Sequence, residues 1–252
     1  MTDVKSRSLT HYSFQLNSYR TSGWRHVMRN AKQVVNVWDP VIRIGHWTLV
    51  LAFFTAYLTE DDLMIVHVWA GYSVAGYLLL RLAWGLIGGK YARFSRFVYS
   101  PARVFAYLKN LAAGKPQHYI GHNPAGGAMV IALLLSLSGT ALTGMKLYAV
   151  EDNKGPFAVS IGHAETSFRF IAAAKADEAK DDDEDGKSAD AGEREDQQSE
   201  EFWEELHEFF ANSTLLLVLL HVLGVVVSSR VDKENLVKAM LTGKKDIDDT
   251  YQ

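Results

Sequence analysis

Cysteine is missing from the 252-residue chain, and its absence excludes several redox and catalytic chemistries. Without thiols the protein forms no disulfide, binds no iron–sulfur cluster through cysteine, performs no thiolate catalysis and attaches no c-type haem through a C-x-x-C-H motif. Any redox centre therefore needs other ligands. A large excess of charge of one sign is also missing, since the formal net charge is -3. This balance by itself indicates no class of partner.

The mean hydropathy of the whole chain is near zero, but the chain contains four long hydrophobic runs separated by polar segments. Each run approaches or exceeds the roughly 20 residues with which a helix crosses about 30 Å of hydrocarbon. In lipid every backbone group needs an internal hydrogen-bond partner, so such runs form helices rather than open strands. We therefore expect an all-α integral membrane protein built on a bundle of four transmembrane helices. The predicted spans are Val41–Thr59, Val66–Gly88, Ala125–Val150 and Leu206–Ser229.

The polar segments differ in charge, and this difference predicts an orientation. Lysine and arginine concentrate before the first run, after the second and after the fourth, whereas the segment between the third and fourth runs is acidic. The positive-inside rule places the basic segments in the cytoplasm, which predicts a multi-pass protein of the bacterial inner membrane with both termini cytoplasmic. The expected divisions are a cytoplasmic segment 1–36, spans one to three within 37–150 with a cytoplasmic loop at about 89–123, a periplasmic insert 151–205, a fourth span 206–229 and a cytoplasmic tail 230–252.

The segments outside the spans carry further expectations. The residues before the first run are polar and lack a cleavage motif, so we expect no signal peptide and a first helix that acts as its own anchor. Residues 173–201 of the insert are dominated by Ala, Asp, Glu, Lys and Gly. Such a stretch buries too little apolar surface to offset its ordering entropy. We expect it to be disordered or partly helical, either as a solvated spacer or as an arm that docks a basic partner.

Local patterns predict helix positions near the membrane surface. In WDPVIRIGHW, residues 38–47, Asp39 suits an N-cap and Pro40 the first helical position. Between residues 89 and 121, aromatic and basic side chains favour a helix that lies on the inner membrane surface. An ordinary soluble connector is the alternative interpretation of that loop.

Two histidines lie at the ends of the fourth hydrophobic run. His207 and His221 are fourteen residues apart, which is about 21 Å and almost four turns along a helix. Their rings therefore share one helix face at opposite membrane depths, where polar groups are candidates for function. Because successive spans alternate in direction, we expect His46 at the depth of His221 and His67 at the depth of His207.

Each depth-matched pair can supply two axial imidazoles to one iron porphyrin between facing helices. The sequence thus predicts two b-type haems with bis-histidine ligation. A zinc site is the competing use of four histidines, but it requires convergence within about 2 Å of one metal, which the axial separation on the fourth span excludes.

Small and basic residues near these histidines have two interpretations each. Glycines leave room for a porphyrin or simply for a neighbouring helix. Arg43 and Arg81 lie on the cytoplasmic side of their helices, where they can hold haem propionates or reach lipid phosphate. The glycines concerned are Gly45, Gly71, Gly76 and Gly224.

Several stretches together resemble the bacterial cytochrome b561 family, which is similar to the cytochrome b subunit of nickel-iron hydrogenases. The likeness covers roughly Val37 to Lys245 and leaves the first thirty residues and the acidic insert unexplained. It implies that His46, His67, His207 and His221 ligate two b-type haems. The motifs are VWDPVIRIGHW, HVWAGYSVAGYLLLRLAWGLIG followed by KYARF, GHNPAGGAMVIALLLSLSGTALTG, HEFFANSTLLLVLLH and ENLVKAMLTGKK.

The resemblance also implies a quinone site where the third span begins. In the related gamma subunit of formate dehydrogenase, an Asn-and-Gly stretch at this place binds quinone. Here Asn123 would hydrogen-bond a quinone carbonyl and His122 would exchange its proton. The alternative is an ordinary helix start with Asn123 as cap and Pro124 in the first turn. The matching small residues are Ala125, Gly126 and Gly127.

The leading functional hypothesis is a di-haem cytochrome that transfers electrons between the quinone pool and a periplasmic redox partner. That partner would be a c-type cytochrome or a dehydrogenase or hydrogenase subunit. A transporter or proton-conducting protein with a histidine relay is the alternative, and a membrane anchor without redox activity is a third interpretation. Membrane lipid is an expected contact, an oligomer is possible, and no nucleic-acid partner is expected.

Overall fold

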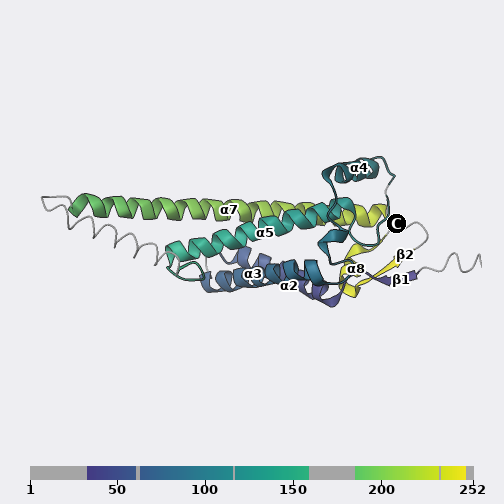
Figure 1. Ribbon diagram of the computed structural model, residues 1–252, viewed down its shortest axis with the longest axis horizontal. Coiled ribbons are helices and arrows are strands. Elements are labelled where there is room, and N and C mark those ends of the chain that lie inside the picture. Colours follow the sequence, from purple (N-terminus) through teal and green to yellow (C-terminus); the bar gives the residue numbers. More distant parts are fainter. Residues whose placement is uncertain (1–32, 61–62, 116, 159–184, 233, 248–252) are drawn as a thin grey trace, which may run out of the picture.

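The computed structural model describes residues 33–60, 63–115, 117–158, 185–232 and 234–247 (Figure 1). Its elements, in chain order, are strand β1 (Gln33–Asn36), helices α2 (Pro40–Leu58) and α3 (Met64–Ile87), the short 3-10 helix η1 (Phe94–Arg96), helices α4 (Pro101–Ala112), α5 (Pro124–Glu151), α7 (Asp185–Val231) and α8 (Leu236–Thr242), and strand β2 (Lys244–Ile247).

Four long helices, α2, α3, α5 and α7, form an elongated bundle (Figure 1). Helix α5 packs along α7, α2 packs along α3, and α3 also contacts α5. All four are long and apolar enough to cross a membrane, α7 over Gln197–Val231. The prediction of four spans is therefore confirmed, with boundaries one or two residues from those expected for the first three.

Helix α7 differs from the expected fourth span, because it begins at Asp185 rather than near Leu206. Its first turns belong to the acidic insert, and glutamate, which has high helix propensity, is the commonest residue in them. The insert and the span are thus partly one continuous helix. Residues 159–184, where the rest of the expected disordered stretch falls, lie outside the described residues.

A two-stranded antiparallel sheet of four residues per strand adds to the predicted helical bundle. In it, Gln33 pairs with Ile247 and Asn36 with Lys244. The carbonyl of Gly243, which has a positive φ of 79°, accepts hydrogen bonds from the backbone amides of Val37 and Trp38. The chain that enters α2 is thereby joined to the tail that follows α8. We call this end of the bundle the sheet end, and the opposite end, where α2 leads to α3, the turn end.

Side-chain caps start two of the spans, as the sequence predicts. Asp39 Oδ1 accepts the amide of Ile42 at 3.0 Å and Pro40 opens α2, while Asp39 Oδ2 accepts Trp84 Nε1 at 3.0 Å. Asn123 Oδ1 accepts the amide of Gly126 at 2.7 Å at the start of α5. These contacts supply partners for amides that a helix start leaves unpaired.

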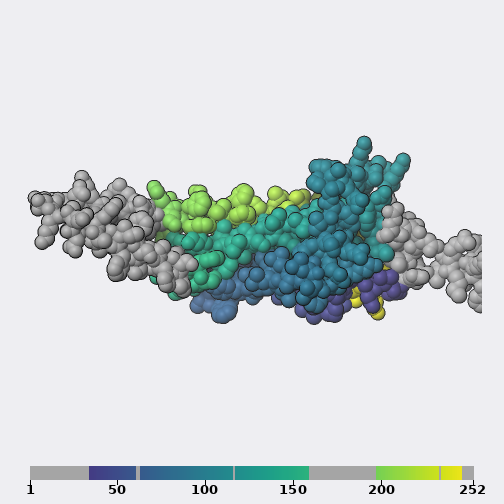
Figure 2. Space-filling view, viewed as in Figure 1, coloured from purple at the N-terminus to yellow at the C-terminus, as the bar shows by residue number. Residues whose placement is uncertain are grey.

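The loop between α3 and α5 contains the helix expected there, α4. Its side chains project from one side of the bundle near the sheet end (Figure 2). Its Tyr107 is buried against the protein, whereas Phe105 and Leu108 are exposed. The apolar face of α4 is therefore only partly covered, which is typical of a helix at a membrane surface.

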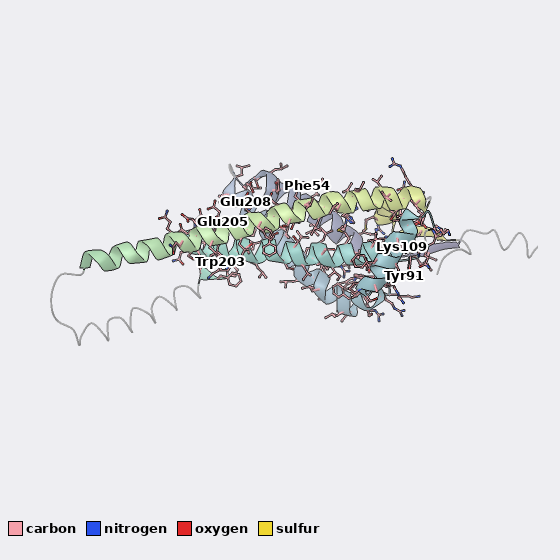
Figure 3. The ribbon with its side chains drawn as sticks, turned by 90° about the horizontal axis from the view of Figure 1, so that it is seen from above. Phe54, Tyr91, Lys109, Trp203, Glu205 and Glu208 are labelled. Carbon is pink, nitrogen blue, oxygen red and sulfur yellow. The ribbon has the colours of Figure 1, made fainter. Side chains whose placement is uncertain are left out.

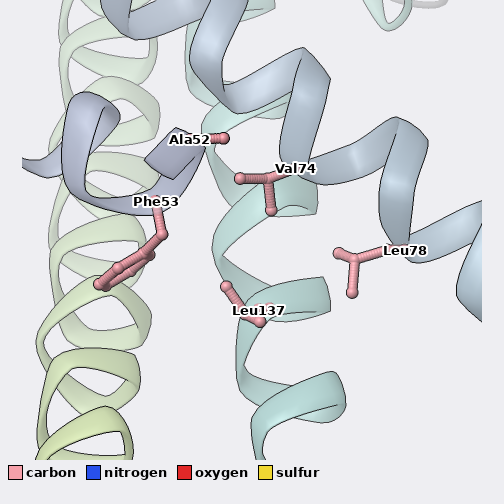
Figure 4. Packing of buried hydrophobic residues seen from close by; sticks show 5 residues of the cluster. All are labelled: Ala52, Phe53, Val74, Leu78 and Leu137. Atoms are coloured by element: carbon pink, nitrogen blue, oxygen red, sulfur yellow. The ribbon is translucent and has the colours of Figure 1, made fainter. Parts of the chain in front are cut away.

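The centre of the bundle holds a small apolar cluster and a group of hydroxyls. Ala52, Phe53, Val74, Leu78 and Leu137 pack together (Figure 4). Many other large apolar side chains on the spans point outward, as a lipid-facing surface requires. Between α5 and α7, the fully buried Thr214 lies 2.7 Å from Ser136 and 3.2 Å from Thr140, measured between hydroxyl oxygens.

Candidate functional site

Two pairs of histidine rings lie inside the bundle, one near each end. At the sheet end, the rings of His46 on α2 and His221 on α7 have centroids 6.4 Å apart. At the turn end, the rings of His67 on α3 and His207 on α7 have centroids 6.1 Å apart. These are the two pairs that matching by depth predicts, and α7 contributes one ring to each.

The ring separations fit an iron atom held between two imidazoles. A metal–nitrogen bond of about 2 Å on each side, with each ring centre about 1 Å beyond its nitrogen, gives about 6 Å between centroids. Among the residues that the structure describes, no three His, Cys, Asp or Glu side chains gather around one metal position. The geometry therefore favours two bis-imidazole sites over one zinc site.

Backbone carbonyls orient both rings at the turn end. His67 Nδ1 lies 2.9 Å from the carbonyl oxygen of Ala56, and His207 Nδ1 lies 3.0 Å from that of Thr140 and 3.2 Å from Thr143 Oγ1. A carbonyl only accepts hydrogen bonds, so each Nδ1 carries the proton and donates it. The lone pair of each Nε2 is left for a metal, which is the usual arrangement of ligating histidines.

A cavity that is partly open to its surroundings lies beside the turn-end pair. Its wall is largely apolar and includes both histidines, three tyrosine side chains, Gly71 and Gly144. A Cβ built on Gly144 would lie 2.7 Å from the His207 ring, so glycine at this position makes room for the ligand side chain. The tyrosines are Tyr57, Tyr72 and Tyr148.

The glycines expected to make room for a porphyrin divide into two groups. A Cβ on Gly45 would collide with the ring of Tyr77, so this glycine allows α2 and α3 to approach each other. A Cβ on Gly71, Gly76 or Gly224 would meet nothing within 4 Å among the described atoms. These three positions face open space that a flat ring could occupy.

Arg81 is the buried cation of the sheet end. Its side chain is 6% exposed, and its guanidinium carbon lies 5.0 Å from the ring centre of Phe94 and 5.7 Å from that of Phe97. Its Nη1 has no hydrogen-bond partner among the described residues. Because a buried guanidinium without an acceptor is costly, this donor fits a carboxylate such as a haem propionate. Arg43, the other expected propionate partner, donates from Nη1 to the carbonyl of Thr242 at 3.1 Å, and its Nε has no partner among the described residues.

His122 lies, partly buried, between two aromatic rings at the same end. Its ring centre is 4.6 Å from that of Trp38 and 4.6 Å from that of Phe97. Burial, followed by the positive charge of Arg81, lowers the pKa of His122 to about 3. The imidazole is therefore neutral at physiological pH, and its Nδ1 has no partner within the described part of the chain.

The residues next to His122 have structural roles. Asn123 caps α5 through Oδ1, and a Cβ on Gly126 would lie 3.2 Å from that oxygen. A Cβ on Gly127 would collide with the carbonyl oxygen of Phe97, so glycine lets the loop cross over the start of α5. Ala125 is half-buried in the same turn. The helix-start interpretation of GHNPAGG is confirmed, and a quinone at these residues stays a prediction.

Sequence reasoning missed the ion pairs that close the sheet end. Lys245 Nζ lies 2.8 Å from Glu234 Oε2 and donates to the carbonyl of Tyr119 at 3.1 Å. His118 Nδ1 lies 3.3 Å from Asp232 Oδ1. Tyr119 lies 126 residues before Lys245, and His118 and Asp232 lie in separate segments of the chain, so no spacing within the sequence signals that these groups meet.

Charge is also distributed unequally between the two ends. Side chains such as Glu205 and Glu208 lie along α7 toward the turn end, whereas Lys109 lies at the sheet end (Figure 3). This matches the charge pattern from which an orientation is expected.

The chain matches known proteins over most of the bundle. The sequence model of the prokaryotic cytochrome b561 family matches residues 37–243. A probable Ni/Fe-hydrogenase B-type cytochrome subunit of Bradyrhizobium diazoefficiens is 28% identical over 160 residues, which are 51% of this chain and 62% of that protein. One of Rhizobium leguminosarum bv. viciae is 27% identical over 148 residues, 47% of this chain and 61% of that protein.

The matched part thus spans about three fifths of the length of these curated relatives. No solved structure matches the chain significantly. Since the family model covers most of the chain and includes all four spans, the chain belongs to the prokaryotic cytochrome b561 family and is a multi-pass membrane protein.

Proposed function

We propose that this chain holds two b-type haems and carries electrons across the bacterial inner membrane between the quinone pool and a periplasmic redox partner. The observation that carries the proposal is the presence of two histidine pairs, 6.4 Å and 6.1 Å between ring centres, on one face of α7. His207 and His221 are about 21 Å apart along the helix axis. Two sites at this separation span most of the hydrocarbon layer of about 30 Å.

The residues of the chain hold, orient and enclose these sites. Haem supplies the one-electron chemistry when it is bound. His46 and His221 would ligate one iron, and His67 and His207 the other. The carbonyls of Ala56 and Thr140 fix the turn-end rings, while the largely apolar wall keeps water from the site.

The partner that the relatives favour is a hydrogenase. Both curated relatives are named as probable cytochrome subunits of nickel-iron hydrogenases. We therefore propose that a dehydrogenase or hydrogenase subunit delivers electrons at the turn end, which we expect in the periplasm because the basic segments lie toward the sheet end. A c-type cytochrome is the second candidate, because a basic protein would be attracted to that acidic segment.

The quinone site would lie at the sheet end beside Arg81 and His122. Arg81 is buried there, His122 is partly buried, and both contact the ring of Phe97. Asn123 uses Oδ1 for its cap, which leaves the amide nitrogen as a donor for a quinone carbonyl. Because His122 is neutral, we expect it to act as a hydrogen-bonding group rather than as a stored proton.

Purification after expression with ample haem tests the proposal directly. We expect b-type alpha bands in the reduced-minus-oxidised spectrum and about two haems per chain by the pyridine haemochrome assay. A colourless protein with intact helical content would contradict the proposal and favour the histidine-relay transporter.

A cap-preserving substitution tests the quinone site separately. Asn123→Ser keeps an oxygen that can cap α5 but removes the amide donor. We expect slower electron exchange with a quinone analogue and an unchanged haem spectrum. Equal exchange rates in the variant and the parent protein would argue against a quinone at Asn123.

A further inference from the structure

The loop between α3 and α5 carries positive charge that its own sequence does not compensate. Residues 63–150 contain neither Asp nor Glu, whereas the loop 88–123 contains six lysines and arginines. In the described part of the chain, no ion pair joins any of the six to a carboxylate. The loop therefore presents a cationic surface, which is made of Lys90, Arg93, Arg96, Arg103, Lys109 and Lys115.

Helix α4 gathers its large apolar side chains on one arc and has a cation at each edge of that arc. With 3.6 residues per turn, successive residues are about 100° apart, and Arg103 lies about 40° beyond one end of the arc while Lys109 lies about 40° beyond the other. The arc covers about 160° and consists of Tyr107, Leu111, Val104, Leu108 and Phe105.

One half of the arc is covered by the protein and the other half is open. Tyr107 is 3% exposed, and its ring centre lies 5.9 Å from that of Tyr119. Phe105 and Leu108 are 72% and 44% exposed. Lys109, which borders them, is exposed as well. We call Phe105, Leu108 and Lys109 the open face of α4.

The fold holds the open face at the level where the spans end. Helix α4 packs against α5, and Tyr119, which contacts Tyr107, lies five residues before Pro124, the first residue of that span. The side chains of α4 project from the bundle at this level (Figure 2). In a bilayer, the polar headgroups lie where the hydrocarbon layer ends, so they lie beside α4.

Aromatic rings accompany the cations of this loop. Lys90 Nζ lies 5.3 Å from the ring centre of Tyr91, and the guanidinium carbon of Arg103 lies 5.6 Å from that of Tyr99. Tyrosine is enriched at membrane–water interfaces, because its ring is apolar and its hydroxyl is polar. Basic residues next to a membrane attract anionic headgroups.

We propose that the open face of α4 and the cationic surface of the loop bind anionic phospholipids, such as phosphatidylglycerol, in the leaflet at the sheet end. Phe105 and Leu108 enter the boundary between headgroups and acyl chains, and Lys109 contacts a lipid phosphate. The lipid thereby supplies the negative charge that residues 63–150 lack. This role needs neither haem nor quinone and is separate from electron transfer.

Site-specific labelling tests the proposal, because the parent chain has no cysteine that would compete for the label. Leu108→Cys carries an environment-sensitive fluorophore on the open face. Ala106→Cys carries it at an exposed position about 160° around the same helix and is the matched control. The full chain is reconstituted in nanodiscs of equal amounts of phosphatidylglycerol and phosphatidylcholine, with bromine on the acyl chains of one lipid at a time.

We expect brominated phosphatidylglycerol to quench the Leu108→Cys label at least about twofold more strongly than brominated phosphatidylcholine. The Ala106→Cys label should be quenched weakly by both. The ratio compares two lipids around the same labelled protein, so quenching by any bound haem cancels. Equal quenching of the Leu108→Cys label by the two lipids would overturn the preference for anionic lipid.

Salt and a charge reversal test whether the preference is electrostatic. Raising the ionic strength from 0.15 M to 1 M shortens the screening length from about 8 Å to about 3 Å and should bring the ratio close to one. In the Leu108→Cys protein, Lys109→Glu should lower the ratio. Lys154→Glu, which reverses an exposed cation after α5, should leave it unchanged. Equal effects of the two reversals would overturn the role of α4.

A Leu108→Cys label that neither lipid quenches would overturn the proposal in one of two ways. If the protein is then dimeric by size, a second copy covers the open face. If it is monomeric, α4 is a connector that stands in water.

Discussion

The two histidine pairs have nearly the same ring separation but are oriented by different means. At the turn end, the carbonyls of Ala56 and Thr140 fix both Nδ1 atoms. At the sheet end, His46 Nδ1 has no partner among the described residues, and its ring meets the edge of the Trp47 ring, with 5.2 Å between the ring centres. The comparison teaches that one helix can present two equal ligands while its neighbours give each a different environment.

The substitutions with the largest expected effect remove the haem from one histidine pair and leave the other pair intact. His67→Ala or His207→Ala should remove the turn-end haem and retain the other, and His46→Ala or His221→Ala should do the reverse. Each variant should therefore lose about one of the two haems in the pyridine haemochrome assay. His118→Ala, which changes a histidine outside the spans, should lose none. Loss of the same spectral component from both pairs would contradict the assignment.

A glycine next to a ligand should affect only the turn end. Gly144→Ala puts a methyl group 2.7 Å from the His207 ring, and Gly139→Ala puts one 2.5 Å from Phe210 on the same helix pair. Both changes should destabilise the packing of α5 on α7 by about 1–3 kcal/mol. Thermal unfolding should show this loss for both variants, but only Gly144→Ala should lower the turn-end haem content. Equal haem loss in the two variants would assign the effect to packing alone.

The hydroxyl of Thr214, which lies between the two histidine pairs, should contribute to the stability of the protein but not to the binding of either haem. Thr214→Val leaves the shape of the side chain but removes its contacts with Ser136 and Thr140. Interhelical hydrogen bonds in membranes contribute about 0.6 kcal/mol on average, so we expect a loss of this order in the free energy of unfolding. Thr48→Val, at an exposed position on α2, is the matched control. Both proteins should retain two haems.

The smallest expected effect is a pH dependence confined to the sheet end. Burial raises the pKa of the Asp232 carboxyl, against the lowering influence of His118 and Lys245. Since the folded protein then binds this proton more tightly than the unfolded chain, the associated stability is present at low pH and decreases as pH rises through the folded pKa. Asp232→Asn should flatten this part of the stability profile in a pH series of thermal melts. An unchanged slope would show that another group titrates there.

The sequence predicted the order of the spans, their approximate limits and the pairing of the histidines by depth. These features depend on position along the helix axis, which the number of residues gives directly. Fourteen residues between His207 and His221 already determine both their face and their separation on a helix. Asp39 and Asn123 were likewise predictable as caps, since their hydrogen bonds involve residues only three positions away.

Contacts between distant segments could not be predicted in this way. Strand β1 consists of four residues without a sustained pattern, and only its pairing with β2 across the whole chain makes it a strand. Arg43 donates from Nη1 to the carbonyl of Thr242, 199 residues away, a contact that its position near His46 did not signal. The start of α7 at Asp185 was also missed, because an acidic, low-complexity composition resembles a disordered linker.

The sequence by itself determined four membrane-crossing helices and the depth of each histidine, because hydrophobic length and helical periodicity act along a single axis. Only the tertiary structure decided which carbonyls orient the rings, where Arg81 is enclosed, and how the two ends of the chain close the sheet end. These features depend on distances across the bundle, which residue spacing along one helix does not contain.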